Sequence, residues 1–221
     1  MGFVNSAPSS WTTNGLNTGG NLKLGSESAY ARYLADVVRH FHDVNGVTLS
    51  YVSPMNESDS PFAGGGQEGM AVPALQRAIV VQAVGRALAQ QAPYCRIIAD
   101  ESSHVGDQFN PEVPQWMTIP GTSQYVAALA HHLYDFPGDL PIQLARQIGR
   151  LYGEALWCTE VCCINSSTGV FGQHLTVDQA VETSATQSLG SVAPPLLSPS
   201  RVVSGSVPAQ SITTFLLGGR R

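Results

Sequence analysis

Two glutamates stand at the ends of apolar, strand-like segments. Glu57 closes the motif Ser-Pro-Met-Asn-Glu, and Glu160 lies in Trp-Cys-Thr-Glu-Val-Cys-Cys. Hydrolysis of a glycosidic bond needs one carboxylic acid to protonate the leaving oxygen and one carboxylate to act at the anomeric carbon. In retaining enzymes these two groups lie about 5–5.5 Å apart. The pair therefore predicts a retaining glycosidase, provided that the fold brings the two distant positions together.

The neighbouring residues support a catalytic role more strongly for Glu160 than for Glu57. Taken alone, Asn56 and Glu57 fit a helix cap and a solvated charge more readily than an active site. Glu160 interrupts an otherwise apolar and uncharged strand, where a carboxylate needs a partner or a function. Asn56 still supports a functional interpretation, because a side-chain amide can hydrogen-bond a sugar 2-hydroxyl, and that contact strengthens in the transition state.

Three further side chains are candidates for substrate binding. Trp11 lies in a loop rich in Ser, Thr and Asn, where a platform for a sugar ring and simple loop packing explain it equally well. His132 and Tyr134 are two positions apart, so both point to the same side of an extended segment. From there Tyr134 could hydrogen-bond Glu160 and hold it ionised, although a tyrosine satisfied within the core explains this residue almost as well.

The other reactive side chains receive a plainer interpretation. Asp100 and Glu101 follow another apolar segment and are ambiguous polar contacts. No metal or cofactor is predicted, because the cysteine spacing matches no common zinc pattern. Buried thiols or one disulfide of unassigned pairing explain the cysteines better. The histidines interpreted as surface residues are His104 and His174, and the cysteines are Cys95, Cys158, Cys162 and Cys163.

The elements that must position these residues alternate between strand and helix as far as about residue 172. This rhythm, without a hairpin signal, predicts a parallel sheet covered by helices. Polar or acidic residues follow each strand, as at the shared rim of a (β/α) barrel where chemistry takes place. The expected strands are 3–7, 47–52, 95–100, 131–134 and 155–161, and the expected helices are 26–44, 73–92, 123–130 and 141–152.

Composition excludes several classes of partner. The chain has 221 residues, a net charge of -5 and 12% charged residues, without a basic run, so nucleic acid is not an expected partner. No apolar run approaches the roughly 20 residues of a membrane helix, and no signal peptide is recognisable at the start. Residues 174–221 are rich in Ser, Pro, Val and Gly, which predicts a low-complexity, disordered tail with marginal strands at most.

Several motifs in a fixed order resemble glycoside hydrolase family 30, and within it most closely the fungal endo-β-1,6-galactanases. The resemblance covers about residues 3–173. It implies a TIM barrel in which Glu57 is the acid/base after the fourth strand and Glu160 the nucleophile after the seventh. The motifs are Asn-Ser-Ala-Pro, Trp-Thr-Thr-Asn-Gly, Gly-Asn-Leu-Lys, Ser-Pro-Met-Asn-Glu, Gln-Arg, His-Leu-Tyr and Thr-Glu-Val-Cys.

The resemblance also implies an extracellular, monomeric enzyme without a cofactor, whose substrate is a polysaccharide or oligosaccharide. Residues 1–173 are expected to form a partial (β/α)8 TIM barrel of about strands three to seven, followed by the irregular tail at 174–221. Five strands of an eight-stranded barrel cannot close, and they leave two open edges. We therefore expect a truncated copy.

Three functions remain open at this stage. The first is a retaining endo-glycosidase that hydrolyses β-1,6-galactan by double displacement. The second is an inactive remnant that at most binds carbohydrate. The third is another family of the same barrel clan, with xylan or a glucosyl polymer as substrate.

Overall fold

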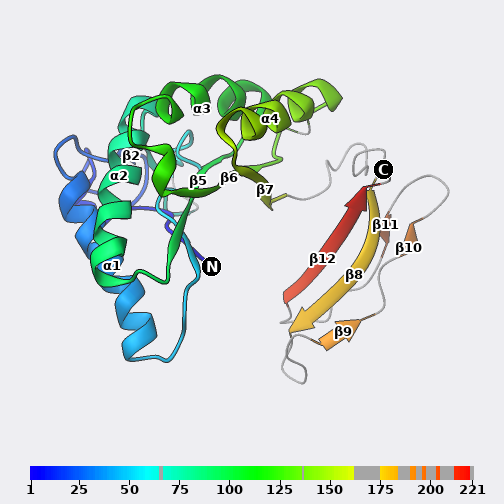
Figure 1. Cartoon of the computed structure of the whole chain (residues 1–221), viewed down its shortest axis with the longest axis horizontal. Helices are drawn as coiled ribbons and strands as arrows, with labels where there is room; N and C mark the ends of the chain where they lie inside the picture. The colour runs from blue at the N-terminus through cyan, green and yellow to red at the C-terminus, as the bar shows by residue number, and fades with distance from the viewer. Residues whose placement is uncertain are drawn as a thin grey trace. The chain divides into compact units, whose positions relative to one another are not determined.

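The chain divides into two compact units, Met1–Val161 and Cys162–Arg221. The computed structural model describes residues 1–64, 67–135 and 137–161 of the first unit and, in the second, the backbone of five strands (Figure 1). No helix in this described part is long and apolar enough to span a bilayer. The expected domain boundary at residue 173 lies outside the described residues and stays a prediction.

The first unit is organised around a five-stranded parallel sheet. Its strand order is β1-β3-β5-β6-β7, and each neighbouring pair is parallel. Because the strands run in the same direction, their carboxyl ends share one edge. The strands are β1 (Gly2–Phe3), β3 (Tyr51–Ser53), β5 (Arg96–Ser102), β6 (Val126–His132) and β7 (Ala155–Glu160).

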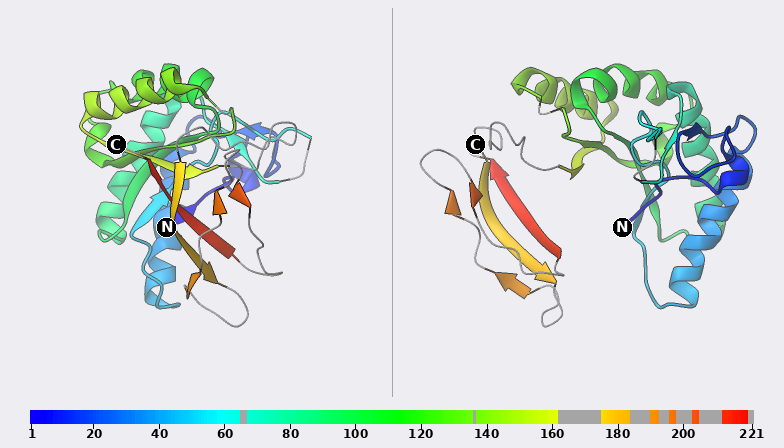
Figure 2. Two further views of the ribbon diagram at one scale, coloured as in Figure 1. Left: turned by 90° about the vertical axis from the view of Figure 1, so that its right-hand side faces the viewer. Right: turned by 180° about the vertical axis from the view of Figure 1, so that it is seen from behind.

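Four helices cover the sheet, as predicted for alternating elements. Consecutive helices contact one another, so they form a continuous layer along the sheet (Figures 1 and 2). Two short strands, β2 (Gly20–Asn21) and β4 (Met70–Ala71), pair in parallel outside the main sheet. The helices are α1 (Glu27–Asp43), α2 (Ala74–Gln91), α3 (Asn110–Met117) and α4 (Asp139–Tyr152), and the short turns of helix are η1 (Ser9–Trp11), η2 (Val105–Phe109) and η3 (Ser123–Tyr125).

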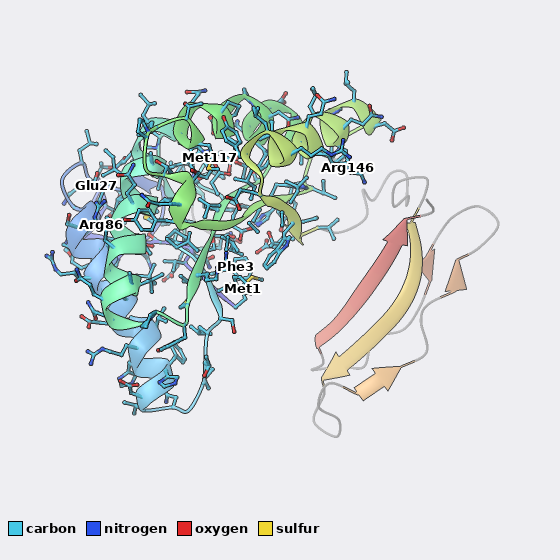
Figure 3. All side chains as sticks on the ribbon, in the orientation of Figure 1. Met1, Phe3, Glu27, Arg86, Met117 and Arg146 are labelled. Carbon is cyan, nitrogen blue, oxygen red and sulfur yellow. The ribbon has the colours of Figure 1, made fainter. Side chains whose placement is uncertain are left out.

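The main core lies between the helices and the sheet. On α1, Tyr30, Leu34 and Val38 recur every fourth residue and are buried, as an amphipathic helix requires. Met117, labelled in Figure 3, belongs to the same core at the end of α3. On β5, Ile97 faces this core while Ile98 belongs to a separate small cluster, because successive strand residues face opposite sides.

The segment between residues 105 and 132 differs from its prediction. Residues 123–130 were expected to form a helix and 131–134 a strand, but η3 occupies only three residues and β6 begins at Val126. Alanine and leucine favour helix locally, yet β6 is paired on both sides, with β5 and β7, and this tertiary context decides. The helix that precedes it is α3, which is not among the expected helices. Pro111 stands in its first turn, where a missing N–H costs nothing.

In the second unit, the described residues form short antiparallel sheets where composition predicted an irregular tail. One sheet has the order β12-β8-β9, and the other pairs β10 with β11. β8 and β12 are rich in β-branched residues, which suit a pleated strand. The bounds are β8 (Leu175–Thr183), β9 (Gly190–Val192), β10 (Leu196–Leu197), β11 (Val203–Ser204) and β12 (Ile212–Gly219).

A buried ion network joins α2 to the carboxyl end of β5. The Arg77 side chain, which is almost fully buried, donates to the Oδ2 atom of Asp100 at 2.6 Å and reaches Glu112 at 2.6 Å. The Trp116 indole donates to the same Asp100 oxygen at 2.8 Å, and the Ser102 hydroxyl donates to its other oxygen. These contacts satisfy a carboxylate that is fully buried and thereby fix the residue next to Glu101.

Arg77→Met should lower the free energy of unfolding by about 3–5 kcal/mol, because it leaves two carboxylates without their buried cation. Urea unfolding followed by tryptophan fluorescence measures this in the first unit, which contains all three tryptophans. Arg86→Met on the exposed side of the same helix is the matched control and should change stability by no more than about 0.5 kcal/mol. Equal losses in the two variants would contradict the prediction.

Candidate active site

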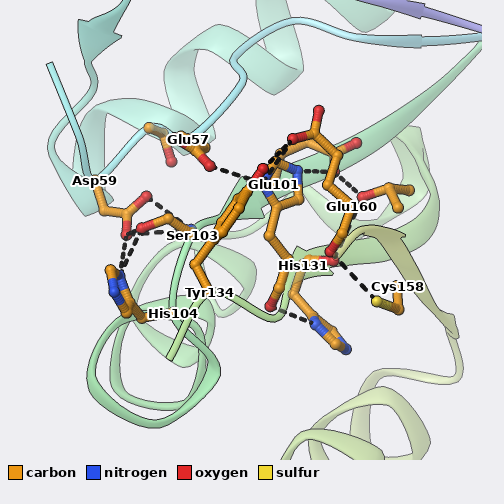
Figure 4. A network of polar contacts seen from close by, with 12 residues as sticks. Glu57, Asp59, Glu101, Ser103, His104, His131, Tyr134, Cys158 and Glu160 are labelled. Carbon is orange, nitrogen blue, oxygen red and sulfur yellow. Dashed lines mark hydrogen bonds and ion pairs between the residues drawn. The ribbon is translucent and has the colours of Figure 1, made fainter. Parts of the chain in front are cut away.

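The carboxyl edge of the sheet brings five polar side chains from four strand ends into one cluster (Figure 4). Glu57 follows β3, and Glu101 lies near the end of β5. His132 ends β6 and Tyr134 follows it, while Glu160 ends β7. The sequence predicted four of these residues, all except Glu101, as site residues, and the fold brings all four of them together.

His132 is the centre of the cluster. Its ring is fully buried, and its Nδ1 atom lies 3.0 Å from the Oε1 atom of Glu57 and 3.5 Å from the Oε2 atom of Glu160. Its Nε2 atom lies 3.2 Å from the Oε2 atom of Glu101. Both ring nitrogens therefore face carboxylates, an arrangement that only a doubly protonated imidazolium can satisfy as a donor on both sides.

The electrostatics of His132 follow from these contacts. Burial lowers the pKa of His132, but hydrogen bonds to Glu101 and Glu57 and the charge of Glu160 outweigh burial and raise it to about 9. The imidazole is consequently a cation at neutral pH. The neighbouring His131 has a pKa that burial shifts downward, and its ring packs edge-on against Phe109 with centroids 5.3 Å apart.

Tyr134 contacts the second glutamate. Its hydroxyl donates a hydrogen bond of 3.0 Å to the Oε2 atom of Glu160. Burial and this contact with Glu160 raise the pKa of Tyr134, so the phenol stays neutral and remains a donor. Glu160 thus accepts a hydrogen bond from Tyr134 and forms a longer ion pair, of 3.5 Å, with the Nδ1 atom of His132.

The backbone of Glu57 is held in an unusual conformation. Its φ angle is 43°, in the left-handed region that side chains other than glycine rarely adopt. The Glu57 N–H donates to the carbonyl of Glu101 at 3.0 Å, and the Ser58 hydroxyl donates to the carbonyl of Asp100 at 3.2 Å. The turn that carries Glu57 is therefore fastened directly to the end of β5.

Asn56 and Trp11 lie apart from these contacts. Asn56 is buried, its N–H donates to the carbonyl of Val4, and its Oδ1 atom has no hydrogen-bond partner among the described residues. The Trp11 ring stacks edge-on against Tyr33 of α1 with centroids 5.7 Å apart, which gives it a packing role. The predicted substrate-binding roles of both residues stay predictions.

Sequence reasoning did not select Glu101 as a site residue. Its carboxylate is fully buried and accepts hydrogen bonds from His132 and from the Thr159 hydroxyl. A carboxylate directly after an apolar strand indicates a site residue, but Asp100 beside Glu101 has the same position in the sequence. In the structure Asp100 belongs to the network with Arg77 instead. His104, predicted to be a surface residue, is partly exposed and lies 2.7 Å from the Ser103 hydroxyl, which donates to Asp59.

The cluster also has the donor atoms of a metal site. One ligand atom each from Glu57, His132 and Glu160 lie within 4.8 Å of one another. A metal bound there would have to displace the proton that His132 holds between these carboxylates. Cys95 and Cys158 are not joined to each other, and the remaining two cysteines lie outside the described residues.

The comparison with protein families decides the class. The model of O-glycosyl hydrolase family 30 matches residues 1–115, just over half of the chain. The chain belongs to glycoside hydrolase family 30. The match includes Glu57 and Glu101 and ends before the other cluster residues. No curated protein sequence matches the chain.

Solved structures show the same fold. The endo-β1,6-glucanase BT3312 superposes with a TM-score of 0.63 at 19% identity, over 76% of this chain and 39% of that one. A conserved exported protein from Bacteroides fragilis gives 0.62 at 18% identity, over 76% and 40%. The catalytic domain of xylanase C of family 30 from Talaromyces cellulolyticus gives 0.51 at 22% identity, over 60% and 32%.

These likenesses confirm the predicted fold class, a partial (β/α)8 barrel. The chain spans 32–40% of the length of these three structures.

The raised pKa of His132 predicts a specific pH dependence of stability in this family 30 chain. Its contribution is complete below the ordinary histidine pKa of about 6.5 and is lost as the pH rises through about 9, at up to about 1.4 kcal/mol for each pH unit. Urea unfolding from pH 6 to 9 should therefore show a steeper decline for the wild-type chain than for His132→Gln. His40→Gln, at an exposed position, should keep the wild-type slope.

Proposed function

We propose that this chain carries the catalytic carboxylates of a retaining endo-glycosidase, with Glu57 as the acid/base and Glu160 as the nucleophile. The observation that supports it most directly is that oxygens of the two carboxylates lie within 4.8 Å of each other. Retaining enzymes keep their carboxyl groups about 5–5.5 Å apart, whereas inverting enzymes need about 6.5–9.5 Å for a water molecule.

The environments of the two glutamates support this division of roles. The Glu160 side chain is 36% exposed and accepts from Tyr134, so the anion is accessible and stabilised by a neutral donor. Glu57 is enclosed, with its side chain 7% exposed, and shares its contact with His132. An accessible, hydrogen-bonded anion suits attack at the anomeric carbon, and an enclosed group beside a proton donor suits proton transfer.

The proposed reaction has two displacements. Glu160 attacks the anomeric carbon while Glu57 gives its proton to the leaving oxygen, which forms a covalent glycosyl-enzyme. Glu57 then takes a proton from water, whose oxygen attacks the same carbon and releases Glu160. Asn56 is proposed to hydrogen-bond the sugar 2-hydroxyl through its buried and otherwise unpartnered oxygen.

The proposed substrate is a β-1,6-linked galactan, in an extracellular setting. Support comes from the motifs Ser-Pro-Met-Asn-Glu and Trp-Cys-Thr-Glu-Val-Cys-Cys, which resemble the fungal endo-β-1,6-galactanases. A structural relative is described as an endo-β1,6-glucanase, another as a xylanase, and a third as an exported protein. Glucan and xylan are therefore the alternative substrates to test.

Purified full-length chain should release reducing sugar from β-1,6-galactan, with β-1,6-glucan and xylan assayed beside it. Glu160→Gln should lower kcat by about 10⁴-fold or more because the nucleophile is lost. Glu57→Gln should lower it by about 10²–10⁴-fold, and less for substrates with an activated leaving group. Glu27→Gln, a buried glutamate bonded to Gln76 and outside the cluster, is the matched control and should keep wild-type turnover.

Two further measurements complete this test: the anomeric configuration of the product, and substrate binding by a chain that shows no turnover. The first product that NMR detects should have the β configuration, whereas an α product would contradict a retaining mechanism. A folded chain that binds β-1,6-galactan in calorimetry without turnover would contradict the enzyme and support a carbohydrate-binding remnant.

A further inference from the structure

Glu101 touches every other strand end of the cluster. Its carboxylate accepts from His132 at the end of β6 and from Thr159 on β7, and its carbonyl accepts from the Glu57 N–H at 3.0 Å. Its side chain is fully buried, and its φ angle of 58° lies in the left-handed region. A buried charge in a strained backbone is expensive, so the surrounding structure must hold it in place.

The contact with His132 constrains the imidazole ring. Because the Nε2–H points at Glu101, the ring can turn only its Nδ1 atom toward Glu57. Nδ1 then donates when the ring is a cation and accepts when the ring is neutral. The Nδ1 atom and the Oε1 atom of Glu57, 3.0 Å apart, are thereby placed to share a single proton.

We propose that Glu101 is a positioning residue, which fixes the orientation and the positive charge of His132 so that His132 and Glu57 share the proton that Glu57 delivers. The delivery step rests on the proposed function. In it the Nδ1–H bond of His132 breaks as an O–H bond forms on Glu57. That O–H bond then breaks as a new O–H bond forms on the leaving oxygen, which takes the electrons of its bond to the anomeric carbon, while Glu160 forms its bond to that carbon. His132 keeps its own proton on Nε2, and water later returns one proton to Glu57.

The groups that face His132 single out Glu101. Glu57 and Glu160 approach Nδ1, the Tyr134 ring lies 5.6 Å away edge-on, and His131 adjoins it in the chain. Within the described residues, Glu101 is the carboxylate that faces Nε2. Removing its charge should therefore weaken the hold on the shared proton while leaving the contacts of Nδ1 in place.

The decisive variant is Glu101→Gln, which keeps the shape and an acceptor oxygen but removes the charge. In full-length chain labelled with ¹⁵N-histidine, NMR should show His132 of the wild type protonated on both nitrogens at neutral pH. In Glu101→Gln the midpoint of its titration should fall by about one to two pH units, the value of one charged hydrogen bond. Glu27→Gln should leave that midpoint unchanged.

If Glu101 only supported the fold, any variant that removes one of its contacts would lower the His132 midpoint, whether or not the charge is kept. Thr159→Val removes the hydroxyl that also binds Glu101 but leaves the charge, so the His132 midpoint should stay at the wild-type value. An equal fall in Thr159→Val and Glu101→Gln, or an unchanged midpoint in Glu101→Gln, would overturn the proposal.

Activity gives the second readout. With a turned-over substrate, the alkaline limb of the kcat/KM profile in Glu101→Gln should move to lower pH in step with the His132 midpoint. An alkaline limb that stays at the wild-type pH would overturn the proposal that His132 and Glu57 share a proton. If the wild-type chain shows no turnover, the proposed function fails, while the NMR measurement still decides whether Glu101 positions His132.

Discussion

His132 is enclosed by carboxylates from three other strand ends, and the arrangement of the site depends on the charge of this one ring. Carboxylates taken out of water repel one another and lose hydration, so they gather only around a compensating cation. The imidazolium provides that cation, with distances of 3.0, 3.2 and 3.5 Å to Glu57, Glu101 and Glu160. Its raised pKa expresses the same balance, because losing the proton would leave the three carboxylates without their counter-charge.

The backbone that carries Glu57 and Glu101 is also held in place by specific contacts. Glu57 and Glu101 both adopt left-handed φ angles, and the N–H of the first bonds the carbonyl of the second. Asp100 is bound in turn by Arg77 and Trp116, which tie the end of β5 to α2 and α3. Asp100 and Glu101, which are neighbours in the chain, therefore have different roles. Asp100 faces the helices and supports the turn, while Glu101 faces the cluster and contacts His132 directly.

These different roles explain which site residues could be predicted from the sequence and which could not. Strand ends in a parallel sheet converge by geometry, so Glu57, His132, Tyr134 and Glu160 could be selected from their positions together with the motifs that resemble family 30. Asp100 and Glu101 look alike in sequence, and only the three-dimensional path of β5 decides which carboxylate points to which side. The same limit applies to residues 126–132, whose alanines and leucine favour helix until two neighbouring strands pair with them.

The cluster distributes its donors unequally between the two proposed catalytic groups. Glu160 receives a neutral donor from Tyr134 and has the charge of His132 at 3.5 Å, yet its side chain remains 36% exposed. An attacking carboxylate needs this combination, since stabilisation must not prevent access to the anomeric carbon. Glu57 is closer to the cation and more enclosed, and its partner is itself fixed from behind by Glu101. In the proposed reaction, Glu57 gives up a proton and later takes one back, and an adjacent group with a firmly held orientation allows both transfers at a single position. The geometry thus favours different tasks for two chemically identical side chains through what each of them contacts, and the proposed role of Glu101 is to maintain that difference through His132.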